Sequence, residues 1–193
     1  MQTVLNLSNL SLSEMAFNLI NNILFVLHRI HRMLKWNRVA GFYREGIRVS
    51  IIGDLSKLPK SLQKLAKDVE LRTRDNSRLD LIVAISYSGR GDIVQACQRI
   101  AQKVKEGLLE PAEVTESLIA QELETSWVTK FNYPDLLIRT SGELRLSNFL
   151  LWQSAYTELY FAKVRWPDFR EADYIEALSS FQRRQRRFGQ RTV

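Results

Sequence analysis

Apolar positions along the chain change spacing between helix-like and strand-like segments. From residue 14 to residue 34 the apolar side chains recur at three, four or six positions, which predicts an amphipathic helix with Ser13 as its N-cap. Ile47, Val49 and Ile51 alternate with polar residues, as a strand does. Residues 79–85 form a nearly continuous apolar run, which is typical of a strand buried on both faces.

Three further helices and one more strand follow from the same patterns. The predicted helices cover residues 60–74, 93–104 and 111–123, and the third strand covers residues 135–139. Helices that alternate with strands imply right-handed crossovers and a parallel sheet. We therefore expect an α/β fold with a mainly parallel central sheet covered by helices. Ligands of such sheets bind at the carboxyl ends of the strands.

Composition indicates one domain with one core. The chain has 193 residues, of which 45% are hydrophobic. Its lone cysteine, Cys97, cannot form an internal disulfide, and no Cys/His pair stands at metal-ligand spacing. Any bound metal is therefore expected to have oxygen ligands.

The net charge of +7 predicts an anionic partner. Much of the excess lies near the C-terminus, which is either a solvated helix end or an anion-binding tail; its arginines are Arg183, Arg184, Arg186, Arg187 and Arg191. No nucleic-acid-binding pattern accompanies this charge, so a nucleic-acid partner is not expected. No targeting segment is seen, and the apolar stretch at 15–27 is too short to cross a bilayer.

The turn from Ser86 to Asp92 joins the apolar strand to a helix. Such a turn is a common anion site, because backbone N–H groups at a helix N-terminus point outward. It is also a common ordinary turn. With only Gly89 and Gly91, and no following Lys-Ser/Thr pair, the ordinary turn is the favoured interpretation and the anion site the alternative.

The strongest local signal follows the third strand. Arg139, Arg145 and Ser147 lie within nine residues, around Gly142. Two guanidinium groups and a hydroxyl suit a diphosphate, and a glycine lets the backbone approach it closely. The alternative is that Arg139 pairs with Glu143 and that the loop is only a polar connection.

Glu158 is an acidic residue among aromatic and apolar neighbours. A carboxylate in such a setting needs a partner. Mg²⁺, which is bound by one or two carboxylates and phosphate oxygens, and an arginine are both open alternatives.

Several ordered motifs resemble those of the cis-prenyltransferase family, which includes undecaprenyl, dehydrodolichyl and neryl diphosphate synthases. The motifs are GIRVSIIGDLSKLP at 46–59, LIVAISYSGRGDIVQA at 81–96, RTSGELRLSNFLLW at 139–152, AYTELYF at 155–161, WPDF at 166–169 and RRFG at 186–189. The sequences of these motifs are most similar to those of plastid-type plant members.

The resemblance implies a transferase that condenses isopentenyl diphosphate onto an allylic diphosphate to make a Z-polyprenyl diphosphate. It implies that Arg139, Arg145 and Ser147 hold the diphosphate of isopentenyl diphosphate and that Glu158 helps to bind Mg²⁺. It also implies a homodimer in which Arg187 and Gly189, an Arg-x-Gly motif, reach the partner's site. A plastid or cytoplasmic location and peripheral membrane association through the lipid product are further expectations.

The chain departs from the family before Gly46. The family's Asp-Gly-Asn-Gly-Arg-Trp motif, whose aspartate anchors Mg²⁺ on the allylic diphosphate, does not occur, so no catalytic residue is assigned. We interpret the chain as a single N-terminally truncated domain, divergent over residues 1–45 and family-like over 46–190. Its first strand is expected to be missing, which would leave neighbouring strands unpaired. The alternative function is an inactive isoform that pairs with an intact synthase. Product length and allylic primer are not predicted.

Overall fold

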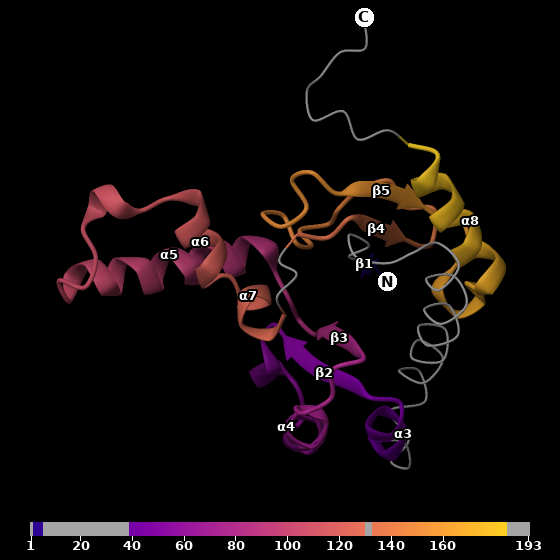
Figure 1. Cartoon of the computed structure of the whole chain (residues 1–193), viewed down its shortest axis with the longest axis horizontal. Coiled ribbons are helices and arrows are strands. Elements are labelled where there is room, and N and C mark those ends of the chain that lie inside the picture. The colour runs from indigo at the N-terminus through magenta and orange to yellow at the C-terminus, as the bar shows by residue number, and fades with distance from the viewer. Residues whose placement is uncertain (1, 6–38, 130–132, 185–193) are drawn as a thin grey trace, which may run out of the picture. The chain divides into compact units, whose positions relative to one another are not determined.

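The computed structural model describes residues 2–5, 39–129 and 133–184, and these form two compact units (Figure 1). The first unit comprises residues 1–30, 133–145 and 156–193, and the second comprises residues 31–132 and 146–155. The helix predicted at 14–34 lies outside the described residues, as do Arg187 and Gly189.

The second unit is built around two parallel strands. Strand β2 (Ile47–Ile52) pairs with β3 (Leu79–Ala84), from Ile47 beside Leu79 to Ile52 beside Ala84. The helices of this unit are α3 (Val39–Arg44), α4 (Lys60–Thr73), α5 (Gly89–Lys105), α6 (Glu116–Glu122) and α7 (Glu124–Val128), with short 3-10 turns at Leu55–Lys57 and Pro111–Glu113. The positions of both strands and of the crossover helix α4 confirm the sequence prediction, but β3 is not buried on both faces, because residues 79–83 are only partly buried and Ala84 is exposed.

Side chains accept hydrogen bonds from the backbone amides along the edge of β2 that is not paired with β3. The Val49 amide donates to the Thr73 hydroxyl (3.0 Å) and the Ile51 amide to a Glu70 carboxylate oxygen (2.8 Å). Beyond the strand, the Gly53 amide donates to Glu124 (2.6 Å). Unpaired edge amides are a template for unwanted strand pairing, and these acceptors from α4 and α7 remove them from that role.

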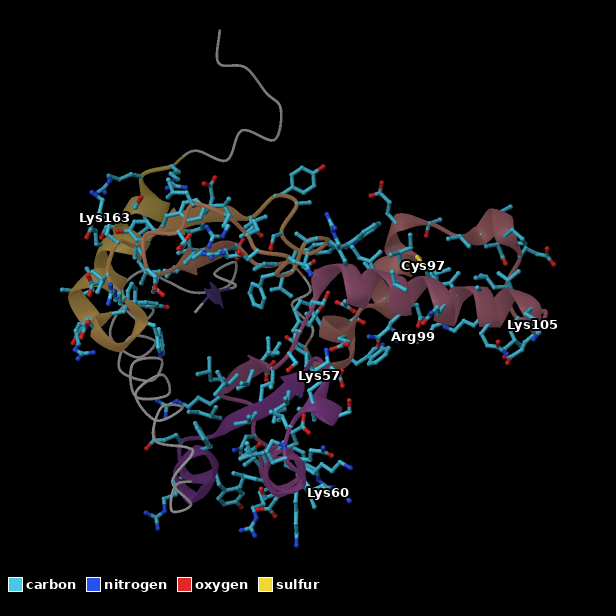
Figure 2. All side chains as sticks on the ribbon, turned by 180° about the vertical axis from the view of Figure 1, so that it is seen from behind. Lys57, Lys60, Cys97, Arg99, Lys105 and Lys163 are labelled. Atoms are coloured by element: carbon cyan, nitrogen blue, oxygen red, sulfur yellow. The ribbon has the colours of Figure 1, made fainter. Side chains whose placement is uncertain are left out.

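The prediction of one helix over 111–123 was wrong. Thr115 accepts a hydrogen bond from the Leu118 amide and so starts α6 as its N-cap, while Leu123 is extended and separates α6 from α7. The Arg99 guanidinium of α5 stacks 4.3 Å from the Trp127 ring of α7 and pairs with Glu122 of α6 (3.4 Å). Figure 2 shows Arg99 on α5, where Cys97 is exposed.

The first unit has a three-stranded sheet in the order β1-β4-β5. Strand β4 (Leu136–Arg139) pairs in parallel with β5 (Glu158–Phe161) and antiparallel with β1 (Gln2–Leu5). Both edges of β4 are therefore paired, so the expectation of an unpaired neighbour is wrong for this strand. Strand β1 was not predicted. In the part of the chain that the structure describes, β3 has no second strand partner.

Helix α8 (Glu171–Gln182) packs on this sheet and completes the core of the first unit. Leu136 and Ile138, which alternate along β4, share a buried cluster with Tyr174 and Leu178 of α8. Tyr174 is 0% exposed, and its hydroxyl has no hydrogen-bond partner in the described structure. None of the described helices is long and apolar enough to cross a membrane.

The buried Tyr174 predicts a loss of stability in alkali. Burial raises the pKa of its hydroxyl, so the folded state keeps the neutral form while the unfolded chain ionises near pH 10. This group therefore lowers the free energy of unfolding by about 1.4 kcal/mol per pH unit above pH 10 and has no effect below it. Tyr174→Phe should remove that dependence and, because an unsatisfied hydroxyl is lost, should not destabilise the protein at pH 7.

Urea unfolding at pH 7, 9, 10 and 11 measures this prediction. Tyr156→Phe is the matched control, because Tyr156 is 85% exposed and its variant should follow the wild type at every pH. A Tyr174→Phe variant that is more than about 1.5 kcal/mol less stable at pH 7 would show that the hydroxyl has a partner.

Candidate functional site

Arg139 ends β4, and the loop that follows folds back onto it. The Ser141 amide donates to the Val164 carbonyl (2.8 Å) and the Gly142 amide to the Ala162 carbonyl (2.9 Å). These bonds place the turn against the chain beyond β5. The Arg139 guanidinium then donates to the backbone carbonyl of Arg145. The Arg139 side chain is thus joined to the backbone of Arg145 at the carboxyl end of β4.

Arg145 forms an ion pair with Glu143 in the same loop. Glu143 is therefore paired with Arg145, whereas the alternative interpretation paired it with Arg139. The Arg145 side chain is 64% exposed, so solvent screens this pair and an incoming anion can reach the guanidinium. The loop therefore presents a cation at the surface beside the end of a parallel strand.

Ser147 belongs to a segment of the second unit, residues 146–155, that we call the anchor segment. Its backbone is unusual, because Ser147 (φ 48°), Asn148 (φ 62°) and Leu150 (φ 45°) all adopt left-handed conformations. Asparagine tolerates this region, whereas serine and leucine rarely do. Strained residues persist only where surrounding contacts hold them.

Asn148 supplies the contacts that hold this strained backbone. Its carbonyl accepts from the Gly89 amide (2.8 Å), its side-chain oxygen accepts from the Arg90 amide (2.8 Å), and its side-chain nitrogen donates to the Ser88 hydroxyl (2.9 Å). The Gly91 amide is taken by Ser88, the N-cap of α5 (3.1 Å). Internal acceptors thus use the donors of the first turn of α5, which supports the ordinary-turn interpretation of Ser86–Asp92.

A second buried cluster fixes the far end of the anchor segment. Asp92 is 2% exposed and accepts hydrogen bonds from the Tyr87 hydroxyl (2.7 Å), the Glu124 amide (2.9 Å) and the Gln153 side chain (3.2 Å). Gln153 also donates to Thr125 (3.1 Å). Burial, followed by the hydrogen bond to Asp92, raises the pKa of Tyr87. This cluster therefore ties α5, α7 and the anchor segment together.

Sequence reasoning missed the Asn148 and Asp92 contacts. Asn148 lies 60 residues from Ser88, and Gln153 lies 61 residues from Asp92. The one available signal was the position of Asn148 directly after Ser147 in a polar loop, and it does not indicate a partner.

Glu158 lies at the opposite end of the β4–β5 pair from Arg139. It is the first residue of β5 and stands beside Leu136, whereas Arg139 stands beside Phe161. These positions are three residues apart along the strands, which corresponds to about 10 Å along the sheet. The Glu158 carboxylate accepts from Arg184, just after α8 (2.8 Å), and the same arginine nitrogen donates to the Leu159 carbonyl (2.9 Å). Of the two partners considered for Glu158, the structure shows an arginine.

Comparison with known proteins decides the family. A prenyltransferase family model with the description "Putative undecaprenyl diphosphate synthase" matches residues 16–189. The chain belongs to this family. Its match to the family extends over most of the chain and includes the α5 turn, the Arg139–Arg145 loop and the anchor segment.

Individual relatives agree with this assignment. The chain is 60% identical over 156 residues to cis-prenyltransferase 4, chloroplastic, of Solanum lycopersicum, covering 81% of this chain and 50% of the relative. It is 57% identical over 167 residues to dehydrodolichyl diphosphate synthase 2 of Arabidopsis thaliana, covering 86% of this chain and 53% of the relative. The chain thus spans about half the length of these curated relatives.

Solved structures of the same family share the fold. Lavandulyl diphosphate synthase from Lavandula x intermedia, crystallised in complex with dimethylallyl diphosphate, has a TM-score of 0.73 at 43% identity, covering 79% of this chain and 68% of that chain. A probable undecaprenyl diphosphate synthase from Campylobacter jejuni has a TM-score of 0.68 at 30% identity, covering 88% and 76%. The predicted α/β fold of cis-prenyltransferase type is confirmed.

Members of this prenyltransferase family generally use Mg²⁺. In the described part of this chain, however, no three His, Cys, Asp or Glu side chains come together as a metal site. Glu158 already pairs with Arg184, and the β4–β5 register separates it from Arg139. The described residues therefore form no such three-ligand centre, and no step of the proposed chemistry is assigned to a metal.

Proposed function

We propose that this prenyltransferase-family chain binds the diphosphate of isopentenyl diphosphate and takes part in the synthesis of Z-polyprenyl diphosphates. The observation that carries the proposal is the loop at the carboxyl end of β4, in which the Arg139 guanidinium donates to the Arg145 backbone carbonyl and the Arg145 side chain is 64% exposed. Ligands of parallel sheets bind at this edge, and the names of the relatives agree with this chemistry.

The chemical role of the loop follows from its donors. Guanidinium groups bind diphosphate oxygens with charge-assisted, forked hydrogen bonds, and the Ser147 hydroxyl adds a neutral donor. Binding at these groups would hold isopentenyl diphosphate by its anionic end and leave its alkene free to attack an allylic carbon. Departure of the allylic diphosphate is a separate requirement, and no described residue is assigned to it.

Binding of isopentenyl diphosphate to the 193-residue chain, measured by isothermal titration calorimetry, tests the proposal. Arg145→Ala should weaken binding by about 30-fold, because one charge-assisted contact is worth roughly 2 kcal/mol. Arg165→Ala, which removes an exposed arginine of the same unit, is the matched control and should change affinity less than twofold. Equal affinities of the wild type and Arg145→Ala would reject the site.

Catalysis is tested separately from binding. The chain is incubated with isopentenyl diphosphate, an allylic diphosphate and Mg²⁺, first alone and then together with a full-length relative. Product from the chain alone supports the synthase proposal. Binding without product from the chain alone, together with a turnover of the full-length relative that changes when the chain is added, would favour the alternative of a dimer partner.

Assembly, domain organisation and location complete the proposal. We propose one domain that contains both compact units and a homodimer in which Arg187 and Gly189 reach the partner's site; light scattering of the purified chain measures its mass.

A plastid location is supported by the chloroplastic relatives. Peripheral membrane association would follow from the lipid product. Participation of Glu158 in Mg²⁺ binding is retained as a prediction that requires Arg184 to leave its carboxylate.

A further inference from the structure

The anchor segment continues directly from the loop that carries Arg145. Ser147 itself has a left-handed backbone (φ 48°), which serine rarely adopts without support. The side chain that follows, Asn148, makes two hydrogen bonds to α5 and its carbonyl makes a third. The backbone next to Ser147 is therefore held by the N-terminus of α5.

The fit between Asn148 and α5 depends on a glycine. A β-carbon added to Gly89 would lie 3.0 Å from the Asn148 carbonyl oxygen and 3.1 Å from the Leu151 amide nitrogen. Both are backbone atoms and cannot move aside as a flexible side chain can. The Phe149 ring, next to Asn148, also meets the Tyr87 ring edge-on with 5.8 Å between centroids. Asn148, Phe149 and Leu151 of the anchor segment thus lie against the start of α5 and the turn that precedes it.

We propose that Asn148 is a positioning residue for diphosphate binding: by closing the N-terminus of α5 it holds the Ser147 backbone in its left-handed conformation before the ligand arrives. The inference rests on the proposed function. Because the Ser147 conformation is established beforehand, the ligand does not have to order that residue on binding, and affinity is gained through preorganisation. The α5 N-terminus acts through Asn148 and does not itself contact the diphosphate.

The variant Asn148→Gly tests the positioning role of the Asn148 side chain without adding backbone strain. Glycine adopts a positive φ freely and keeps the carbonyl that accepts from Gly89, so only the two side-chain hydrogen bonds are lost. We expect inorganic pyrophosphate to bind about tenfold more weakly, which is the loss expected when one residue is ordered during binding. Gly89→Ala adds a β-carbon on α5 that pushes the same segment away, and it should weaken pyrophosphate binding to a similar extent.

Asn76→Gly is the matched control. Asn76 lies in the same unit and also makes two side-chain hydrogen bonds, to the carbonyls of Ile47 (2.9 Å) and Phe42 (3.3 Å). It should destabilise the protein as much as Asn148→Gly while leaving pyrophosphate affinity within twofold of the wild type. If Asn76→Gly weakens binding equally, Asn148 has only a structural role and the proposal is overturned.

Nuclear magnetic resonance of the full chain supplies a readout that a structural role would not change. In the wild type the Arg90 amide should be protected from hydrogen exchange, and the Ser147 amide resonance should shift on addition of pyrophosphate. In Asn148→Gly, at a temperature where the variant is folded, the protection of the Arg90 amide should be lost and the Ser147 shift should need about tenfold more pyrophosphate. Loss of Arg90 protection with an unchanged pyrophosphate affinity would overturn the inference. A wild type with Arg90 protected and no pyrophosphate binding would instead refute the proposed function, and the inference with it.

Discussion

Replacing Gly53 by alanine should leave too little stability for the chain to fold. Gly53 follows β2 with φ of 100°, a conformation that L-residues rarely adopt. Its added β-carbon would lie 2.2 Å from the Ile85 carbonyl oxygen and 2.9 Å from the backbone of Tyr87. All these obstacles are backbone atoms at the end of β3, so relief requires β2 and β3 to separate. We expect a loss of more than about 4 kcal/mol in the free energy of unfolding.

Urea unfolding followed by circular dichroism measures the loss. Gly107→Ala is the matched control, because Gly107 also has a positive φ (70°) but would have nothing within 4 Å of its β-carbon. It should cost only about 1 kcal/mol, the cost of the backbone conformation alone. If both variants lose the same amount, the close approach of β3 to Gly53 does not occur.

Asp92→Ala is expected to have the second-largest effect on stability. The Asp92 carboxylate accepts hydrogen bonds from Tyr87, Glu124 and Gln153, and alanine would leave these donors, one buried and two partly buried, without that acceptor. Each unsatisfied donor costs about 1–3 kcal/mol, part of which water entering the cavity can recover. We expect a total loss of about 3–5 kcal/mol and release of the anchor segment from α5.

The same urea titration tests this prediction, and Asp68→Ala serves as its control. Asp68 pairs with Arg72 one helical turn away on the exposed face of α4, so its replacement should cost less than about 0.5 kcal/mol. Amide exchange at the Glu124 N–H should increase in Asp92→Ala alone. A loss below about 1 kcal/mol would mean that the buried cluster has another acceptor.

Local patterns were sufficient to predict β2, β3 and α4 of the second unit. The alternation at Ile47–Ile51 and the apolar run at 79–85 identified β2 and β3, because one strand face must be apolar wherever a sheet is covered. The end of a helix was harder to predict. The break at Leu123 depends on a single extended residue between two helical segments, and the apolar spacing continues through it.

The candidate site was predicted in part. Arg139 and Arg145 were identified by their charge and position after a strand; the structure joins the Arg139 side chain to the Arg145 backbone, and their role in binding stays a prediction. The partner of Glu158 was left open between Mg²⁺ and arginine. That choice depended on the distance between the start of β5 and the end of α8, which are 26 residues apart at Glu158 and Arg184.

The sequence by itself determined the family, the α/β class and the identity of the cationic loop, because these depend on residue types and on spacings of a few positions. The tertiary structure decided which polar groups are already paired. Asn148 accepts a hydrogen bond from the Arg90 amide of α5, Asp92 accepts one from the Glu124 amide, and Glu158 accepts one from Arg184. A hydrogen bond between residues dozens of positions apart exists only once packing has brought them within about 3 Å of each other. No periodicity along the chain encodes that distance.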